Sequence, residues 1–373
     1  VRYNVLTQQI VAWTGVLLKI FDVGAKWAAI GILLHVVAGI PMTTGILVSG
    51  VVTLVYVTFG GLWGVIVTDL IQFIVQVLGG IVMFVLVVKR LGGLNSITQI
   101  WDRLPPSHSN LFNDPYTAGF VGIMFFLYFL SYNGGSWSLA TRYISSPNEK
   151  EASKAARLSG ILYLIWPLIL FFPMWAAPLI LPGLANPAES YGWLMVKILP
   201  QGMIGLVIAS LFAATMGMTA SDVNTIAAVI TRDILPVVSK KFHNDKHSLR
   251  TARITTFGFT LATIGIALNY EQFGGVLGLI VNWFGALLGP TSMPLLLGLL
   301  PAFKTCGPKA AISSIIAGVI TFVITKNMNL NSLALEVGLP TIVSAIVYVG
   351  VGLTTKTVPK KVKDLIAALK ITT

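Results

Sequence analysis

The stretch from Gly119 to Tyr143 reads GFVGIMFFLYFLSYNGGSWSLATRY. It begins as an apolar helix, and the Asn-Gly-Gly at 133–135 then favours turn geometry over helix. In hydrocarbon every freed backbone group needs a partner, so a broken helix at that depth lies inside protein or beside a watery cavity that can hold a solute. Alternatively, Gly134 and Gly135 only let a neighbouring helix approach closely. This stretch alone leaves both interpretations open.

The composition is that of a membrane protein. The mean hydropathy is +0.84. Hydrophobic residues make up 55% and charged residues 10% of the chain, whereas a soluble domain carries about 25% charged residues. The single cysteine, Cys306, excludes an internal disulfide framework and a cysteine-based metal site. The net charge of +12 is explained by membrane topology, so no nucleic-acid partner is predicted.

The apolar runs predict about ten transmembrane helices. They cover residues 6–38, 41–59, 62–89, 117–137, 155–182, 201–231, 251–268, 274–300, 309–325 and 335–355. Residues 1–355 are therefore predicted to form one integral membrane domain in the lipid bilayer. Residues 356–373 form a basic tail, which is either an amphipathic helix on the anionic leaflet or solvated.

The positive charges predict the orientation. With Val1 placed in the cytoplasm, eighteen of the 25 Lys and Arg residues fall on the cytoplasmic side and five on the opposite side. We therefore expect a multi-pass protein of the cell (plasma) membrane with both ends of the chain in the cytoplasm.

Three charged residues lie inside the first span. Lys19, Asp22 and Lys26 are spaced i, i+3 and i+7, so they share one helical face. Charges at membrane depth are costly and normally face a cavity or a partner. The three residues either line the route of a solute or form a self-neutralising cluster packed against another helix.

Two further spans carry polar residues. In the third span, Asp69, Gln72 and Gln76 align on one face near the cytoplasmic end, which predicts either a gate or ion vestibule or a hydrogen-bonded helix seam. The sixth span combines small residues with hydroxyl groups and Asp222, a carboxylate that must be paired, protonated or ion-bound. Its oxygens suit an alkali cation, although hydroxyl groups in membrane helices often bond only their own backbone.

The sequence gives no support for an enzyme. It contains no Walker lysine motif and no Gly-x-Ser-x-Gly motif, so neither an ATP-driven pump nor a serine hydrolase is indicated. His243 and His247 are spaced i, i+4, but they flank a basic polar loop and do not form a convincing metal set.

Several motifs together resemble the sodium:solute symporter family. Gly60-Gly61-Leu62-Trp63 with Thr68-Asp69 and Gln72 is similar to that family's Gly-Gly-Leu…Thr-Asp…Gln signature. Arg142 with the following Glu-Ala and Ala-Ala pairs resembles its cytoplasmic loop, and Leu211-Phe212-Ala213-Ala214 through Asp233 resembles its sodium-site helix. The order and spacing of the motifs cover essentially the whole chain.

The resemblance implies an all-α inverted-repeat transporter fold of five plus five helices. It implies that the interrupted Gly119–Tyr143 span is the discontinuous sixth core helix. On this basis an amino-terminal piece, including the first two core helices, is expected before Val1. The resemblance also implies a Na+ site on the sixth span, at Ala214, Gly217, Met218, Ser221 and Asp222. Family members usually carry a Ser/Thr pair at Gly217 and Met218, and a thioether is a poor ligand for Na+.

We therefore predict a secondary transporter that moves a small polar solute by alternating access, with Na+ symport. The predicted solute site consists of Tyr132, Asn133, Gly134, Ser136, Trp137, Lys19 and Asp22, and the predicted gate of Asp69 and Gln72. Sugar-transporting members carry an Asn-Gln pair where this chain has Ser136 and Trp137, so a sugar is not predicted. Gly217 and Met218 motivate an alternative, a transporter-derived sensor or regulatory protein that binds a solute without sodium coupling.

Overall fold

A computed structural model of the chain describes residues 2–132, 145–239, 242, 248–328, 330, 332–355 and 358–371. Within these residues all regular elements are helices, apart from a single bridge between Asn113 and Tyr116. The first part of the chain forms α1 (Val5–Ala38), α2 (Met42–Arg90), α3 (Ser96–Arg103), α4 (Pro106–Ser109), α5 (Ala118–Leu130), α7 (Glu149–Ile180), η2 (Pro187–Glu189) and α8 (Ser190–Ile198). The second part forms α9 (Gln201–Val229), η3 (Ile230–Ile234), α10 (Leu235–Val238), α11 (Ser248–Leu268), η6 (Tyr270–Phe273), α12 (Gly275–Asn282), η7 (Trp283–Leu288), α13 (Gly289–Leu297), η8 (Pro301–Phe303), α14 (Pro308–Asn327), α15 (Leu333–Leu353) and α16 (Lys360–Ile371).

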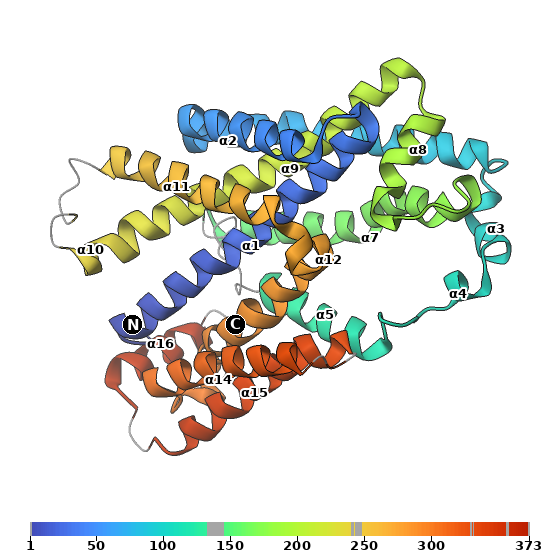
Figure 1. Ribbon diagram of the computed structural model, residues 1–373. Coiled ribbons are helices and arrows are strands. Elements are labelled where there is room, and N and C mark those ends of the chain that lie inside the picture. The colour runs from blue at the N-terminus through green and yellow to red at the C-terminus, as the bar shows by residue number, and fades with distance from the viewer. Residues whose placement is uncertain are drawn as a thin grey trace.

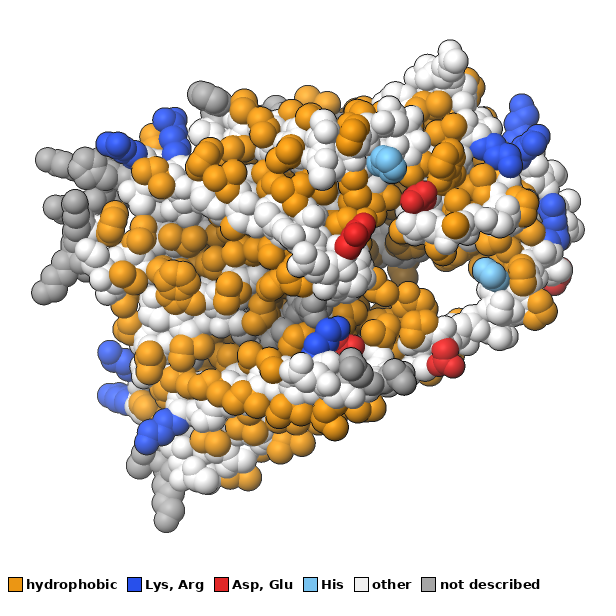
Figure 2. Space-filling view, viewed as in Figure 1, with side chains coloured by type: hydrophobic (Ala, Val, Ile, Leu, Met, Phe, Trp, Pro, Cys, Tyr) orange, Lys and Arg blue, Asp and Glu red, His pale blue; other side chains and the backbone are white. Residues whose placement is uncertain are grey.

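The prediction of an all-helical membrane protein is confirmed. Seven helices of the described chain are long and apolar enough to cross a membrane: Val5–Ala38, Asp69–Arg90, Glu149–Ile180, Gln201–Val238, Leu249–Leu268, Pro308–Asn327 and Leu333–Leu353. Met42–Thr58 and Ala118–Leu130 are shorter apolar helices. Figure 2 shows hydrophobic side chains covering the middle of one face, with most Lys and Arg side chains near its two ends.

Four of the predicted spans differ in detail or are only partly described. The runs 41–59 and 62–89 belong to one continuous helix, α2, because the backbone stays helical through the glycines that separate them in sequence. The run 274–300 is divided into α12, the π-helical η7 and α13. For the run 117–137, the structure describes α5 and a π-helical turn up to Tyr132, and the predicted interruption at 133–135 lies outside the described residues.

Side-chain caps fix the starts of several spans. Asn4 accepts a hydrogen bond from the Thr7 backbone N–H at 3.0 Å at the start of α1. Asn148 does the same for Glu151 at the start of α7, also at 3.0 Å. Such caps satisfy N–H groups that the first helical turn leaves without partners. At its other end, α1 stops at Gly39, whose φ of 65° is a left-handed conformation that glycine adopts readily.

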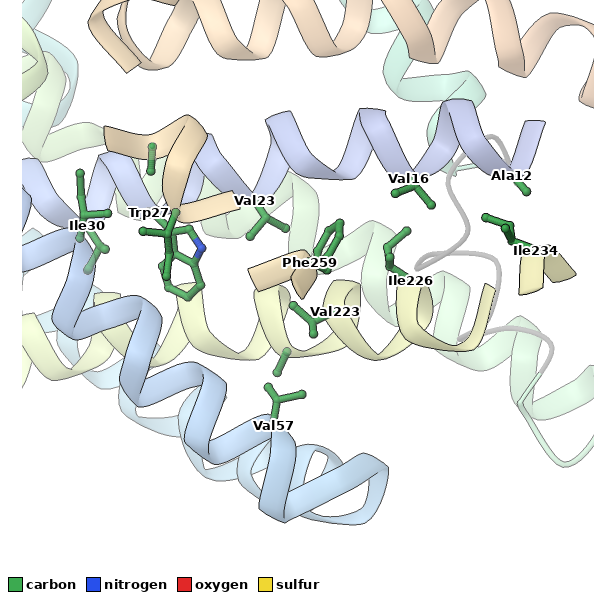
Figure 3. Packing of buried hydrophobic residues seen from close by; sticks show 14 residues of the cluster. Ala12, Val16, Val23, Trp27, Ile30, Val57, Val223, Ile226, Ile234 and Phe259 are labelled. Atoms are coloured by element: carbon green, nitrogen blue, oxygen red, sulfur yellow. The ribbon is translucent and has the colours of Figure 1, made fainter. Parts of the chain in front are cut away.

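The helices form two groups. In the upper part of Figure 1, α1, α2, α9 and α11 pack together, and in the lower part α14 packs on α15. The first group shares a core of fourteen buried hydrophobic residues, among them Trp27 of α1, Val223 of α9 and Phe259 of α11 (Figure 3). The Trp27 indole Nε1–H donates to Thr263 Oγ1 at 3.2 Å, so this large side chain is both packed and hydrogen-bonded.

Two residues before α1 attach the start of the chain to the second group. The Arg2 guanidinium donates to the carbonyl oxygens of Gly298, Phe303 and Cys306 at 2.6, 2.8 and 2.8 Å. The Tyr3 hydroxyl donates to the Pro294 carbonyl at 2.5 Å and bonds the Tyr348 hydroxyl at 2.6 Å. These bonds tie the start of the chain to the end of α13, to the segment that follows it and to α15.

The basic tail is helical over α16. Val362 and Ile366 are buried against the protein, whereas Lys360, Lys361 and Lys363 are exposed. The amino-terminal end and α16 lie toward the same side of the molecule in Figure 1.

Candidate functional site

The middle of α1 is enclosed by protein. From Leu18 to Ala28 only residues 20, 21 and 26 are partly accessible, and the others are buried around the whole circumference of the helix. A Cβ added to Gly24 would lie 2.7 Å from Ile266 Cγ2, so α11 approaches α1 very closely at this level. The charged residues of α1 therefore face the interior of the helix assembly.

The periodicity of α1 does place Lys19, Asp22 and Lys26 together, and α9 adds Asp222 from the facing side. Each lysine bridges both carboxylates. Lys19 Nζ lies 2.9 Å from Asp22 Oδ2 and 2.7 Å from Asp222 Oδ1. Lys26 Nζ lies 3.0 Å from Asp22 Oδ2 and 2.8 Å from Asp222 Oδ2. We call these four side chains the charge ring.

The charge ring is electrically neutral and almost dry. The accessible fractions of its side chains are 8% for Lys19, 11% for Asp22, 3% for Asp222 and 20% for Lys26. Isolated charges at such depth cost several kcal/mol each, and pairing two cations with two carboxylates offsets that cost. The pairing agrees with the self-neutralising cluster considered from the sequence, and Lys26 leaves the cluster partly open.

The Trp283 ring of η7 lies beside the charge ring, and a second aromatic contact involves a predicted solute residue. Lys19 Nζ is 5.6 Å from the centre of the Trp283 ring in η7, within the range of a cation–π interaction. Tyr132, predicted to bind solute, donates from its hydroxyl to the Tyr163 hydroxyl of α7, with the two rings edge to face.

The predicted gate residues pack on a different face of α9. A Cβ added to Gly217 would lie 2.8 Å from both Asp69 Oδ1 and Gln72 Oε1 of α2. Glycine is therefore what lets these two oxygens reach the α9 backbone. Gln72 Oε1 is buried and accepts no hydrogen bond from the described residues. Two oxygens, one of them anionic, thus converge beside α9, and oxygen is the ligand type that hard cations prefer.

The predicted Na+ residues do not share one surface of α9. Gly217 is buried against Asp69 and Gln72, whereas the neighbouring Met218 side chain is 50% exposed. Asp222 faces α1, and both of its oxygens are bound by lysines. Ala214 and Ser221 are partly buried. The predicted solute residues Asn133, Gly134, Ser136 and Trp137 lie outside the described residues, so their role remains a prediction.

The sequence did not reveal one pairing, that of Asp222 with the lysines of α1, or two neighbours of the predicted site, Trp283 and Tyr163. Sequence analysis identified Asp222 as a carboxylate in need of a partner but did not connect it with Lys19 and Lys26. The two lysines of the first span outnumber its single aspartate, and this excess of positive charge was the signal that a carboxylate of another span could pair with them. Trp283 and Tyr163 carried no comparable signal, because aromatic residues are frequent in every membrane helix.

Comparison with known proteins decides the family. A family model described as the sodium:solute symporter family matches residues 1–318. The chain belongs to this family. The resemblance noted from the motifs is thereby confirmed.

Individual relatives in this symporter family are distant. The chain is 27% identical over 330 residues to a sodium/glucose cotransporter of Vibrio parahaemolyticus, covering 81% of this chain and 60% of that protein. It is 26% identical over 354 residues to the sodium/pantothenate symporter of Escherichia coli, covering 92% of this chain and 69% of the relative. Against a sodium-dependent multivitamin transporter of Oryctolagus cuniculus it spans 52% of the relative's length.

A solved structure shares the symporter fold. It is the substrate-bound, outward-open state of a Na+-coupled sialic acid symporter, with a TM-score of 0.80, 18% identity, and coverage of 96% of this chain and 76% of the other. The likeness establishes the fold, including the inverted-repeat architecture predicted from the motifs.

Proposed function

We propose that the protein is a secondary transporter that moves a small polar solute across the membrane by alternating access, coupled to Na+. The observation that supports it most directly is the charge ring, which is buried at mid-helix in α1 and whose most accessible side chain is Lys26. Ionisable residues inside a membrane protein mark solute or ion pathways far more often than they serve lipid-facing surfaces. Membership of the symporter family favours transport over a sensor that binds solute without sodium.

In this proposal the solute binds beside Lys19 and Asp22. These residues sit between the first helix group and η7, because Lys19 also contacts the Trp283 ring. Tyr132, together with the predicted residues at 133–137 that lie outside the described chain, is proposed to complete the site. A site between two helix groups fits alternating access, in which one group moves against the other around a bound solute.

Sodium coupling in this proposal uses the opposite face of α9. Asp69 and Gln72 present oxygens at Gly217. On α9, Ala214 lies one turn before Gly217 and Ser221 one turn after it. Asp69 and Gln72 lie on α2, so an ion held there would bridge α2 and α9 and could serve the gating role predicted for them. Met218 contributes nothing to this arrangement because its side chain is half exposed. Both chain ends are placed in the cytoplasm, as the distribution of basic residues predicts.

The deciding experiment is uptake into proteoliposomes with an inward sodium gradient. Labelled L-alanine, glucose and propionate would be tested separately, each against an equal potassium gradient and against protein-free liposomes. We expect one solute to accumulate above its outside concentration only with sodium. Equal accumulation with sodium and with potassium would refute sodium coupling. If none of the three solutes enters the liposomes, transport of the solute classes that they represent would be refuted.

A further inference from the structure

The two carboxylates of the charge ring use their oxygens differently. Asp222 receives Lys19 on Oδ1 and Lys26 on Oδ2. Asp22 receives both lysines on Oδ2 alone. Its second oxygen, Oδ1, accepts no hydrogen bond from any residue that the structure describes. The Asp22 side chain is 11% accessible, and a carboxylate oxygen can accept further hydrogen bonds, so Oδ1 is open to a donor that the described chain does not supply.

The neighbouring donor is Lys26. Its ammonium carries three N–H groups, and two of them point to Asp22 Oδ2 and Asp222 Oδ2. The third has no acceptor among the described residues, and the Lys26 side chain is the most accessible member of the ring at 20%. A spare anionic acceptor and a spare cationic donor therefore lie side by side.

Charge decides which solute groups suit this pair. Hydrogen bonds between ionised partners are about twice as strong as neutral ones. An ammonium group is thus the preferred partner of Asp22 Oδ1, and a carboxylate the preferred partner of Lys26. The ring itself is neutral, so a solute carrying both charges adds no net charge to a buried site, whereas a simple carboxylate adds one.

We propose that Asp22 Oδ1 and Lys26 Nζ bind the ammonium and carboxylate groups of a zwitterionic solute of the α-amino-acid kind. This inference rests on the proposed transport function and names the class of its solute. The apolar part of such a solute has an aromatic surface nearby, since Trp283 lies beside Lys19.

A congeneric series tests the class without any mutation. L-alanine, L-lactate and propionate differ only in the α substituent, which is an ammonium, a hydroxyl or hydrogen. Each would compete against sodium-driven uptake of labelled L-alanine in proteoliposomes. Lactate should compete at least tenfold more weakly than alanine, and propionate more weakly still, because a charge-assisted hydrogen bond is worth roughly tenfold or more in affinity. Trimethylglycine keeps both charges but has no N–H donor and should also compete poorly. Propionate or trimethylglycine competing as well as alanine would overturn the proposal.

A matched pair of variants then locates the contact. Asp22→Asn and Asp222→Asn each remove one carboxylate and two ion pairs from the ring, but only Asp22→Asn removes the free acceptor. We expect the half-saturating alanine concentration to rise at least tenfold more in Asp22→Asn than in Asp222→Asn. Equal changes in both variants would show that the ring only stabilises the fold. If either variant is too unstable to purify, Asp22→Glu is used, which keeps the charge and should retain the preference for alanine over propionate.

The two proposals can fail separately. Sodium-driven uptake of glucose or propionate, with a half-saturating concentration unchanged in Asp22→Asn, would leave the transporter standing and overturn the zwitterion site. Absence of sodium-driven uptake for every solute of the series and for glucose would count against the transporter itself.

Discussion

Lys26 Nζ lies 2.8 Å from Asp222 Oδ2, and this contact joins residues that are 196 positions apart in the sequence. Together with Lys19, it fixes α1 against α9 at a depth where neither helix could present its charge alone. The first helix group is thereby held as one unit by electrostatics as well as by its hydrophobic core. Because the charge ring joins two distant helices and stabilises the first helix group, it is the most informative target for mutation.

Removing Asp222 should destabilise the protein strongly. In Asp222→Asn, Lys19 and Lys26 share the single carboxylate of Asp22, which leaves an unbalanced buried charge. Breaking such a pair costs about 3–5 kcal/mol. Thermal unfolding in detergent would measure the loss. Glu151→Gln is the control, because its ion pair with Lys154 is exposed, with side-chain accessibilities of 47% and 62%, and should change stability by less than about 1 kcal/mol. An unchanged thermal unfolding midpoint in Asp222→Asn would contradict the stabilising role of the charge ring.

Alanine substitutions at two glycines of α9 should have different effects, because alanine at Gly217 disturbs a contact with α2, whereas alanine at Gly205 only favours the helix. At Gly217 the new Cβ would meet Asp69 Oδ1 and Gln72 Oε1 at 2.8 Å, so these side chains must move. At Gly205 nothing lies within 4 Å, and alanine should stabilise the helix by up to about 1 kcal/mol. We expect Gly217→Ala to shift the sodium concentration that half-activates uptake, and Gly205→Ala to leave it unchanged. Equal sodium activation in both variants would remove the assignment of sodium to this face.

Arg2 should contribute more to stability than its position near the start of the chain suggests. Arg2→Gln removes three hydrogen bonds to carbonyl groups around the end of α13, and bonds from a charged donor contribute about 1.5–3 kcal/mol each at most. The control is Arg103→Gln, which loses one exposed bond to the Leu91 carbonyl. Limited proteolysis should cleave the 298–307 segment faster in Arg2→Gln only. Equal cleavage rates in the two variants would contradict the attachment.

Cys306 should be unreactive in the folded protein. Burial raises the pKa of its thiol above the usual 9.0, and only 2% of the residue is accessible. The folded state therefore keeps its proton at a pH where the unfolded chain loses it. The resulting contribution to stability is complete below pH 9 and declines as the pH rises through the raised pKa. Maleimide labelling at pH 7.5 should be slow until the protein is denatured. Because this is the single cysteine, rapid labelling of native protein would contradict its burial directly.

The proposed placement of both chain ends in the cytoplasm can be tested independently of transport. An epitope fused after Thr373 should be reached by antibody in intact cells only after permeabilisation. A tag inserted between Gly183 and Asn186, on the predicted outer side, should be reached without it. Reversed accessibility of the two tags would invert the orientation that the basic residues predict.

Sequence reasoning succeeded where the signal was local. The i, i+3, i+7 spacing was enough to put Lys19, Asp22 and Lys26 on one face, because helical periodicity is fixed by the backbone. It failed where the answer depended on packing between distant helices. No local pattern connects Asp222 with α1, or brings Asp69 and Gln72 to Gly217. The glycines at 60 and 61 were expected to separate two spans, but glycine only weakens a helix, and α2 continues through them.

The charge ring also has a consequence for biogenesis. Taken alone, α1 carries two lysines and one aspartate and is therefore cationic, while α9 carries the compensating anion near its middle. The two helices emerge from the ribosome almost two hundred residues apart, so α1 must remain sheltered by the insertion machinery or a chaperone until α9 arrives. A nascent chain halted before Gln201 would leave α1 with one more lysine than aspartate and no partner for it.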